Sequence, residues 1–500
     1  MNKTHFLKEY FELLLAANLV VKSNVSCILK EEISNISYNS KEVNYNTMFI
    51  CKGDGFKTSY LDEAIKNNAL LYIADKEYEN TSNSPYIIVS DIRKTLALIS
   101  QFFYNTSFSD FKKIAVTGTK GKTTTTFLLN YIFKEALKGS KYNSGVISSL
   151  VLDDGKNIVE SSLSTPESLE LQKHLHACKE NNVKYLPIEV SSQAIKMSRI
   201  YGINFDFGVF LNISDDHYSP TEHKDFNDYF NTKLQLFSSC TRALICLDDE
   251  NASEVFKASK NCKEIFSFSL NDTSADFYAS QICKDKGLTK FKVNYLNKVY
   301  DFELNMIGLF NVSNALAAIS IALLLNIPYN AIFDALRHAS VPGRAEVFTN
   351  TSRNIHVIVD YAHNKLSFEK MYDTIHSEFS KSKIITVFGA PGGKALNRRK
   401  DLGIVASANS KEIYITEDDS NFESTENISN EILSFVDKKA CKSFIISKRD
   451  LAIKSAINAA KDNDVIFIAG KGSDKTQKTK GKQVSYKGDS YFAKKYLNIQ

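Results

Sequence analysis

Residues 114–137, IAVTGTKGKTTTTFLLNYIFKEAL, decide the fold of this chain. The stretch opens with an apolar run only long enough for a buried strand and then turns at two glycines. It continues with the apolar spacing of an amphipathic helix at Phe127, Leu128, Tyr131 and Ile132. In such a turn, backbone N–H groups and the positive end of the helix dipole converge on one point. The stretch therefore predicts a loop that binds phosphate groups.

The residues of this loop have separate predicted roles. Gly118 and Gly121 allow the backbone to turn back on itself. Lys122 supplies a mobile cation for the terminal phosphates of a nucleotide, and Thr123 supplies a hydroxyl suited to Mg2+. The longer pattern G-x-x-x-x-G-K-[ST] fails because its first glycine falls on Val116, and the sequence that stands is T-G-T-K-G-K-T. The alternative is a lysine in a glycine turn before an ordinary helix. It has less support, because strand, loop, Lys-Thr pair and helix occur in the required order.

Composition and charge exclude several classes of function. The 500 residues suggest about three domains at about 150 residues each. A net charge of +5 is too small to indicate a nucleic-acid partner. Eight cysteines without a C-x-x-C pair indicate reduced thiols. The N-terminus lacks a cleavable signal pattern, and the most apolar stretch, residues 315–327, is too short to span a bilayer. We therefore expect a cytoplasmic monomer without a membrane or nucleic-acid partner.

The pattern along the chain predicts three α/β domains with boundaries at 1–109, 110–340 and 341–500. In the first, a helix at residues 60–68 precedes a strand at 70–74, and YIIVSDI precedes the helical pattern RKTLALISQFFY. In the second, strands and helices alternate as a doubly wound parallel sheet requires. In the third, the expected strands are residues 355–359, 384–388, 413–416 and 465–469.

Polar residues follow several expected strands, where open α/β sheets bind their ligands. Glu189 follows the strand that ends at Ile188, and His217 follows the strand expected at residues 207–213. A carboxylate and an imidazole at neighbouring strand ends can bind a cation that also touches nucleotide phosphates. Taken singly, Glu189 is better explained as a helix-capping residue and His217 as a loop histidine. Lys233 has the surroundings of any solvated helix lysine.

Other loops carry weaker signals. Asn311 and Asn314 open an Ala/Leu/Ile-rich helix, where their amides can reach a purine edge or simply cap the helix. A turn at residues 38–41 offers a hydroxyl and a cation. In the third domain each of four expected strands ends in a polar or glycine-rich loop, DYAHN, GAPGGKALNRRKD, EDDSN and GKGSD. These loops predict a ligand site, and the alternative is that they only turn corners.

Nine motifs together make the chain resemble the Mur ligases of peptidoglycan synthesis over essentially its whole length. They are TGTKGKTTT (117–125), STPES (164–168), EVSSQ (189–193), NISDDH (212–217), residues 229–233, GLFNVSN (308–314), VPGR (341–344), DYAHN (360–364) and GKGSD (470–474). Each motif is weak alone, and their joint order and spacing are specific. The resemblance is greatest to the members that add the third residue of the stem peptide. It implies a UDP-binding domain, a central doubly wound P-loop ATPase domain and a C-terminal Rossmann-like domain that binds the amino acid.

The resemblance also implies ATP, two Mg2+ ions and a modified lysine. In such ligases CO2 carbamylates the lysine that corresponds to Lys233, which turns a cation into an anionic oxygen donor for the second Mg2+. The implied catalytic residues are Lys122, Glu189, His217 and Lys233, and the implied metal ligands are Thr123, Glu189, His217 and carbamylated Lys233. The implied ATP-binding residues are Gly118, Thr119, Lys120, Gly121, Lys122, Thr123, Thr124, Asn314, Arg344 and Asp360.

The implied reaction activates a carboxylate by phosphorylation. The γ-phosphoryl group of ATP passes to the D-Glu carboxylate of UDP-MurNAc-L-Ala-D-Glu, and the amine of an amino acid attacks the acyl phosphate. By resemblance, Ser40 holds the nucleotide sugar. The muramoyl-peptide part is expected at Ser164, Thr165, Ser191 and Arg199.

The loop at residues 418–421, Asp-Asp-Ser-Asn, bears on the choice of amino acid. Members that add diaminopimelate have Asn-Pro-Arg after an Asp, and that Arg binds the distal carboxylate with two hydrogen bonds. This chain instead resembles the Asp-Asp-Pro-Asn of lysine-adding members, so we predict L-lysine. The residues expected to bind it are Arg399 at the α-carboxylate and Asp418, Asp419, Ser420, Asn421 and Asp474 around the distal ammonium. Ser420 in place of Pro predicts a looser loop, which leaves ornithine, diaminopimelate or a related carboxylate substrate open.

Two further alternatives remain at this stage. A folylpolyglutamate synthetase belongs to the same superfamily but lacks a domain before the phosphate loop, whereas more than a hundred residues precede Gly118 here. A nucleotide-binding regulator without ligase activity would be expected to have lost Lys233, Glu189 or His217, and all three are present.

Overall fold

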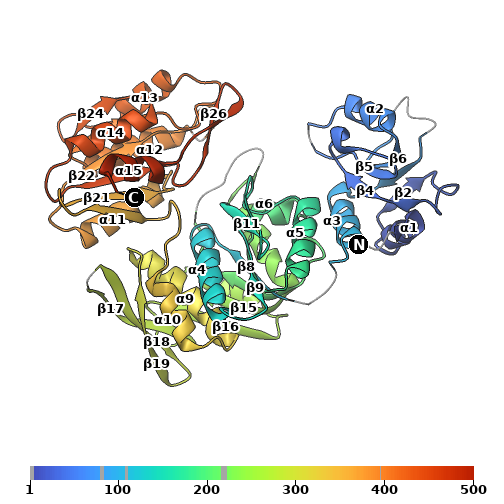
Figure 1. Ribbon diagram of the computed structural model, residues 1–500, viewed down its shortest axis with the longest axis horizontal. Coiled ribbons are helices and arrows are strands. Elements are labelled where there is room, and N and C mark those ends of the chain that lie inside the picture. Colours follow the sequence, from blue (N-terminus) through green and yellow to red (C-terminus); the bar gives the residue numbers. More distant parts are fainter. Residues whose placement is uncertain are drawn as a thin grey trace. The chain divides into compact units, whose positions relative to one another are not determined.

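The computed structural model describes residues 5–53, 55–78, 84–106, 111–214, 222–285, 287–394 and 396–499 (Figure 1). The chain divides into two compact units. The first comprises Met1–Tyr278 and Ala317–Ile332, and the second comprises Ala279–Leu316 and Phe333–Gln500. His217 lies outside the described residues.

The N-terminal part of the first unit is an α/β layer. Its elements are β1 (His5–Phe6), α1 (Leu7–Ala16), β2 (Val20–Ser23), β3 (Glu32–Ile33), β4 (Asn35–Ser37), η1 (Ser40–Glu42), β5 (Thr47–Ile50), α2 (Thr58–Lys66), β6 (Ala69–Ala74), β7 (Tyr86–Val89) and α3 (Ile92–Phe103). Among the described residues, five strands form a sheet in the order β2-β7-β6-β5-β4. Strands β4 to β7 run parallel, and β2 pairs antiparallel with β7. The helix and strands expected at residues 60–68, 70–74 and after Pro85 are confirmed.

The rest of the first unit is built on a larger sheet. Its elements are β8 (Lys112–Thr117), α4 (Lys122–Ala136), β9 (Asn143–Ser144), β10 (Val146–Ile147), β11 (Val151–Asp153), β12 (Ile158–Glu160), α5 (Ser168–Glu180), β13 (Val183–Glu189), α6 (Ser192–Lys196), β14 (Phe205–Phe210), α7 (Phe226–Leu234), η2 (Gln235–Ser239), β15 (Cys240–Cys246), α8 (Ala252–Ala258), β16 (Glu264–Ser269) and β17 (Phe277–Asp285). The last of these crosses into the second unit.

The register of this sheet positions the site. Strands β13, β8, β14, β15 and β16 are parallel neighbours in that order. Glu189 pairs with Val116, and Phe210 pairs with Thr117. The loops that follow β8, β13 and β14 therefore begin at one edge of the sheet, as expected for an open parallel sheet.

The remaining elements lie wholly or partly in the second unit. They are β18 (Leu288–Tyr295), β19 (Lys298–Leu304), α9 (Leu309–Leu324), α10 (Tyr329–Arg337), β20 (Glu346–Asn350), β21 (Ile355–Asp360), α11 (Lys365–Glu378), β22 (Ile384–Phe388), α12 (Asn397–Asn409), β23 (Glu412–Ile415), α13 (Thr425–Ser434), β24 (Lys442–Ile445), α14 (Arg449–Ala459), β25 (Val465–Ala469), β26 (Thr476–Thr479), β27 (Lys482–Ser485) and α15 (Asp489–Leu497). Helices α9 and α10 cross the division between the units.

The C-terminal sheet is covered on both faces. Its order in the described chain is β20-β21-β25-β22-β23-β24, with parallel pairs throughout except for the antiparallel edge strand β20. Ile358 packs with residues of α11, α12 and α13 in one core, whereas Val357 and Val359 pack with residues of α14 and α15 in another. Figure 1 shows these helices around the sheet. Burial on both faces explains why strands such as VIFIA read as continuous apolar runs.

The α/β fold class is confirmed, with two local differences from the sequence-based expectation. Strand β14 ends at Phe210 instead of Ile213, because residues 211–214 leave the sheet and contact the phosphate loop. Antiparallel pairs also occur, β10 with β11, β11 with β12, and β18 with β19, where only alternating strands and helices were expected. In the described residues no helix is long and apolar enough to span a membrane. All eight cysteines are free.

Candidate active site

The phosphate loop connects β8 to α4 as the sequence predicts. Gly118 has a φ of 153° and Gly121, the residue before the helix, has a φ of 87°. A Cβ at Gly118 would lie 3.1 Å from Leu211 Cβ and 3.2 Å from the carbonyl oxygen of Asn212. Both glycines are therefore required by the path of the backbone, and Gly118 also by its close neighbour.

Asn212, which follows β14, holds this loop. Its side-chain oxygen accepts the N–H of Lys120 at 2.9 Å, and its side-chain nitrogen donates to the carbonyl of Lys120 at 3.1 Å. Its own carbonyl accepts the N–H of Thr119 at 2.9 Å. Sequence analysis had placed Asn212 in a matching motif but given it no role.

Lys122 and Lys233 meet at this loop. Lys122 Nζ donates to the carbonyls of Gly118 and Thr119, each at 3.0 Å. Lys233, in α7 and only 1% exposed, donates to the carbonyl of Gly118 at 3.0 Å. Its ammonium lies 4.7 Å from the centre of the Tyr229 ring, a cation–π distance. The structure therefore brings together two of the predicted catalytic residues.

Glu189 and Thr123 form a second contact at the same sheet edge. The Thr123 hydroxyl donates to Glu189 Oε2 at 3.0 Å, and that oxygen also accepts the N–H of Ser149 at 3.0 Å. Glu189 is 3% exposed. Two hard oxygen ligands beside a phosphate loop fit Mg2+, which commonly uses one or two protein ligands together with phosphate oxygens. Within the described part of the chain, no group of three or more His, Cys, Asp and Glu side chains could hold a metal ion. Thr124 is buried in the first turn of α4.

A cavity of about 250 Å³ opens beside these groups. It contains five residues predicted for the site, Lys122, Ser164, Ser191, Arg199 and Lys233. Its other lining residues are Ser162, Leu163, Ser192, Gln193, Glu222, His223 and Tyr229. The two lysines predicted to be catalytic and three of the four residues predicted to bind the muramoyl-peptide part thus line one cavity.

Thr165 and Arg199 are tied to this cavity wall. Thr165 donates to the carbonyl of Glu189 at 2.8 Å and accepts the N–H of Ser191 at 3.2 Å. Arg199 donates to the Thr165 carbonyl at 3.1 Å and pairs with Glu167 at 2.8 Å. Its Nε is buried without a hydrogen-bond partner. Arg199 therefore retains a donor that a bound ligand could use.

Glu167 also pairs with Lys52 from the N-terminal part of the unit, at 2.5 Å. Burial disfavours the charged form of Glu167, but Lys52 and Arg199 outweigh it and hold its pKa below the usual range. Ser40, predicted to hold the nucleotide sugar, is 5% exposed and donates to Glu63 Oε2 at 2.5 Å. It starts the turn η1 that the sequence predicted.

His223 and Tyr229 were not identified from the sequence. The His223 ring lies 3.0 Å from the Ser192 hydroxyl and 3.3 Å from Asp228. Burial lowers the pKa of His223, although Asp228 acts in the opposite direction. The Tyr229 hydroxyl lies 3.1 Å from the Thr119 hydroxyl and thereby joins α7 to the phosphate loop. The sequence signal for Tyr229 was its place in the motif of residues 229–233, whereas His223 lies just before that motif.

The second unit contains the other predicted ATP-binding residues. Asn314 is 6% exposed and donates to the side chain of Asn311 at 3.2 Å. The Arg344 guanidinium lies 4.5 Å from the centre of the Tyr361 ring. Asp360 accepts the N–H groups of Ala345 and Ala362, each at 2.7 Å, and so fixes the loop that carries Arg344.

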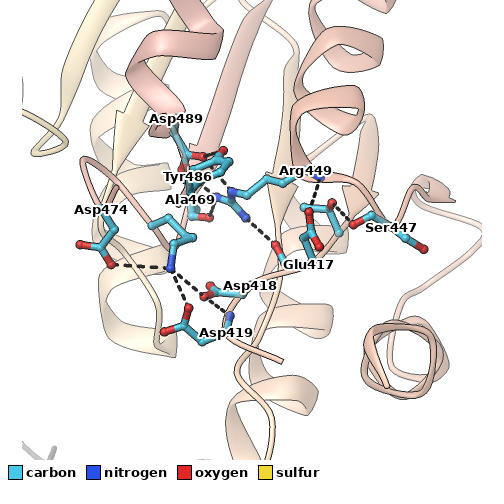
Figure 2. A network of polar contacts seen from close by, with 11 residues as sticks. Glu417, Asp418, Asp419, Ser447, Arg449, Ala469, Asp474, Tyr486 and Asp489 are labelled. Atoms are coloured by element: carbon cyan, nitrogen blue, oxygen red, sulfur yellow. Dashed lines mark hydrogen bonds and ion pairs between the residues drawn. The ribbon is translucent and has the colours of Figure 1, made fainter. Parts of the chain in front are cut away.

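The three predicted aspartates of the second unit gather around one lysine (Figure 2). Lys471 Nζ lies 2.8 Å from Asp419, 3.7 Å from Asp474 and 3.8 Å from Asp418. Burial raises the pKa of Asp474 to about 6, and the neighbouring aspartates add to this rise against Lys471 and Arg344. The structure brings the acidic group together as predicted, but it also fills its centre with a cation that was not predicted.

Arg399 already has partners. One nitrogen donates to Glu423 at 2.8 Å and to Glu431 at 2.5 Å, and the other donates to Glu423 at 2.6 Å. Its side chain is 2% exposed. The glutamates occupy the two terminal nitrogens, whereas Nε is buried without a hydrogen-bond partner, and the predicted role of Arg399 remains a prediction.

The loop that carries Ser420 and Asn421 forms backbone hydrogen bonds with the hairpin β26–β27. Ser420 is 4% exposed, and its N–H donates to the Asp418 carbonyl at 2.9 Å, a bond that proline could not make. Asn421 has a φ of 53°, donates to the Lys478 carbonyl at 2.8 Å and accepts from Lys480 at 2.5 Å. The hairpin β26–β27 therefore restrains a loop that the sequence predicted to be loose.

Comparison with known proteins agrees with this geometry. The Mur ligase middle domain matches residues 116–322, and the Mur ligase glutamate ligase domain matches residues 343–472. A UDP-N-acetylmuramyl-tripeptide synthetase of Lactobacillus delbrueckii subsp. bulgaricus is 33% identical over 497 residues, which cover 96% of each chain. A UDP-N-acetylmuramoyl-L-alanyl-D-glutamate–L-lysine ligase of Streptococcus pyogenes is 38% identical over 464 residues, 92% of each chain.

A solved structure of a UDP-N-acetylmuramoyl-L-alanyl-D-glutamate–2,6-diaminopimelate ligase has the same fold, with a TM-score of 0.67, 22% identity and 99% coverage of both chains. The sequence match to the Lactobacillus relative spans 96% of the chain and so includes most of the segment before the phosphate loop, which the folylpolyglutamate alternative lacks. The chain therefore belongs to the Mur ligase family and is an ATP-dependent, amide-forming ligase of peptidoglycan precursor synthesis.

Proposed function

We propose that this enzyme adds L-lysine to the D-Glu carboxylate of UDP-MurNAc-L-Ala-D-Glu and that it acts as a cytoplasmic monomer. The observation that carries the choice of lysine is the acidic group of Asp418, Asp419 and Asp474 on two loops at strand ends of the C-terminal sheet. Such a group attracts the distal ammonium of lysine and repels the second carboxylate of diaminopimelate. The lysine ligase from Streptococcus pyogenes, 38% identical, supports the same choice.

The first proposed step transfers the γ-phosphoryl group of ATP to the D-Glu carboxylate, which gives an acyl phosphate and ADP. Lys122 would exchange its contacts with the Gly118 and Thr119 carbonyls for phosphate oxygens. The N–H groups of residues 118–124 and the start of α4 would stabilise the same charge. We assign the remaining ATP contacts to Asn314, Arg344 and Asp360.

The acceptor substrate would occupy the cavity beside the loop. Ser164, Ser191 and Arg199 line this cavity, and Thr165 holds the backbone N–H of Ser191 with its hydroxyl and the Arg199 guanidinium with its carbonyl. The unpartnered Nε of Arg199 is a donor for an acidic group of the substrate. The residues of this cavity would orient the substrate, because its D-Glu carboxylate must lie in line with the γ-phosphoryl group of ATP. Ser40 is assigned to the nucleotide sugar.

Mg2+ fits the oxygen ligands of Thr123 and Glu189, and we assign a second ion to His217 and carbamylated Lys233. Bound there, Mg2+ neutralises charge on the transferred phosphoryl group. Unmodified, Lys233 is a buried cation that would repel the ion. Addition of CO2 to its uncharged amine, with loss of a proton, makes it an anionic oxygen donor.

In the second proposed step the α-amine of lysine attacks the acyl phosphate, and phosphate leaves from the tetrahedral intermediate. The acidic group would hold the distal ammonium, so that the α-amine and not the distal amine reaches the acyl carbon. Ornithine, one methylene shorter, would place the same ammonium less well. Diaminopimelate would bring a carboxylate into the acidic group.

The test is phosphate release with ATP, Mg2+ and UDP-MurNAc-L-Ala-D-Glu, measured in parallel with L-lysine, L-ornithine, meso-diaminopimelate and no amino acid. We expect release with lysine at least tenfold faster than with the other three. Preference for another amine would retain the ligase and reject lysine. No release with any amine would indicate a different carboxylate substrate.

A further inference from the structure

Lys471 lies where the ammonium of the proposed substrate is expected. Its side chain is 2% exposed, and its Nζ is within 3.8 Å of Asp418, Asp419 and Asp474. Figure 2 labels the three carboxylates, Asp418, Asp419 and Asp474. Lys471 follows β25 in the G-K-G-S-D motif, where the sequence alone gave it no role. An ammonium group of the chain itself therefore stands at the centre of the acidic group.

The three carboxylates differ in how far they are engaged. Asp419 Oδ1 accepts both Lys471 Nζ at 2.8 Å and the N–H of Lys478 at 3.0 Å. Asp418 and Asp474 lie 3.8 and 3.7 Å from Lys471, which is ion-pair distance but too long for a hydrogen bond. Asp418 Oδ1 also accepts the N–H of Asp419 at 2.6 Å. Lys471 thus pairs closely with Asp419, whereas Asp474 and the second oxygen of Asp418 can accept from a ligand.

Lys471 also affects the net charge of the acidic group formed by Asp418, Asp419 and Asp474. Burial disfavours the charged form of Lys471, but Asp418 and Asp419 outweigh it and raise its pKa. Burial also disfavours ionised Asp419, whose pKa is nevertheless lowered, chiefly by Lys471. One ammonium against three carboxylates leaves an excess of two negative charges when all three are ionised. Without Lys471, the three carboxylates would lose the ammonium that lies within 3.8 Å of each of them and would repel one another without that compensation.

A rigid frame holds the loops that carry these residues. Arg449, fully buried at the start of α14, donates to the Ala469 carbonyl at 2.7 Å and to the Glu417 carbonyl at 3.3 Å (Figure 2). Its guanidinium also forms two bonds of 2.7 Å to Asp489. Arg449 thereby links the end of β23, just before Asp418, to the end of β25, just before Lys471. The distances around Lys471 are fixed by the fold and not by the lysine alone.

We propose that Lys471 is a positioning residue of the amino-acid pocket, whose ammonium holds Asp419 in place and offsets part of the charge of the acidic group so that Asp418 and Asp474 can bind the distal ammonium of the substrate. This inference rests on the proposed function. In it the pocket is built for two ammonium groups, one resident and one brought by the amino acid. Lys471 acts through the carboxylates and does not touch the reacting atoms.

The test compares four proteins: wild type, Lys471→Met, which keeps most of the side-chain volume but no charge, Lys471→Ala, and Lys482→Ala as a control on the exposed strand β27. Phosphate release gives KM for lysine, ATP and UDP-MurNAc-L-Ala-D-Glu separately. For both Lys471 variants we expect KM for lysine to rise about 10- to 100-fold, the range for a lost hydrogen bond to a charged group, with the other two KM values within about threefold. Lys482→Ala should match the wild type.

Chemical rescue of Lys471→Ala by an added amine distinguishes the loss of the ammonium charge from the loss of side-chain packing. n-Propylammonium replaces the atoms that Lys471→Ala removes, and 1-propanol is its uncharged counterpart. We expect the ammonium compound to restore KM for lysine in Lys471→Ala at least fivefold, and neither compound to improve the wild type. Because rescue is measured on one preparation, a general loss of stability would not imitate it.

Three results would overturn the inference. An unchanged KM for lysine in either Lys471 variant would show that the ammonium is not needed. A parallel rise of all three KM values without amine rescue would show a structural role only. A wild-type enzyme that does not use lysine would reject the proposed function and this inference with it, whereas the first two results leave the lysine ligase intact.

Discussion

Lys122 and Lys233 donate to the same carbonyl oxygen, that of Gly118, each at 3.0 Å. Two ammonium groups at one carbonyl repel each other, and the low exposure of Lys233 strengthens the repulsion. An uncharged amine is the form of lysine that reacts with CO2. The arrangement places the proposed phosphate-binding cation and the proposed modifiable lysine at one peptide group.

The first prediction concerns Lys233. Lys233→Ala should lower kcat by about 100-fold or more, because the ligand for the second Mg2+ is lost. A short-chain carboxylate such as acetate or propionate should restore part of the activity, since it can replace the carbamate oxygens. The exposed Lys224 just before the same helix provides the control Lys224→Ala, expected to retain wild-type activity. Unchanged activity in Lys233→Ala would rule out the ligand role.

The second prediction concerns Tyr229. This residue is fully buried and joins α7 to the phosphate loop through its hydroxyl, 3.1 Å from that of Thr119. Tyr229→Phe keeps the ring beneath Lys233 and removes the hydroxyl that makes this contact. We expect a loss of about 1 kcal/mol in the free energy of unfolding, measured in urea, and a rise in KM for ATP of a few fold. If the free energy of unfolding and KM for ATP both equal the wild-type values, the Tyr229 hydroxyl does not hold the phosphate loop.

Local patterns allowed most of the first unit's site to be predicted. The phosphate loop, the polar residues after β13 and the register of the parallel strands follow from residues close together in sequence, because apolar runs and glycine turns determine where strands end. The nine motifs added roles that physics alone could not assign. Lys233 is the clearest example, because nothing in its helical surroundings distinguishes it from a surface lysine until α7 is seen to bury it.

Contacts between distant segments could not be predicted in the same way. The sequence around Lys471 is that of an ordinary loop. The proposed role of Lys471 follows only from its contacts with Asp418 and Asp419, which lie after another strand. Arg399 was expected to be available, but Glu423 and Glu431 occupy it from a separate loop and helix. Ser420 in place of proline suggested a loose loop, and pairing with strand β26 restrains it instead.

The third prediction concerns pH. Burial raises the pKa of Asp474 to about 6, so this carboxyl gains its charge as the pH rises from 5 to 7. The groups that act on it are Lys471 and Arg344, which lower its pKa, and Asp418 and Asp419, which raise it. The distal ammonium of lysine stays protonated throughout this range. Affinity for lysine should therefore fall as the pH falls through about 6.

KM for lysine, measured from pH 5.5 to 8 with saturating ATP and UDP-MurNAc-L-Ala-D-Glu, checks this expectation. The ratio of KM between Asp474→Asn and wild type is the useful quantity, since titration of the substrate amine cancels in it. We expect the ratio to be largest at pH 8 and to shrink below pH 6. A ratio independent of pH would show that Asp474 does not bind the amino acid as a carboxylate.

The last prediction concerns Arg449 and Asp489. Both side chains are completely buried and joined by two hydrogen bonds of 2.7 Å, and the Tyr486 hydroxyl donates to the same carboxylate at 2.7 Å. Arg449→Met should lower the free energy of unfolding by about 3–5 kcal/mol, because Asp489 is left as a buried charge without its partner. Arg242→Met, which breaks a partly exposed ion pair with Glu264, should cost less than about 1 kcal/mol.

The double variant Arg449→Met with Asp489→Leu should recover most of the stability, because no charge remains buried. Its KM for lysine should nevertheless stay raised, since the strand ends before Asp418 and Lys471 have lost the guanidinium that links them. Recovery of both stability and KM would show that Arg449 stabilises the domain without positioning the pocket.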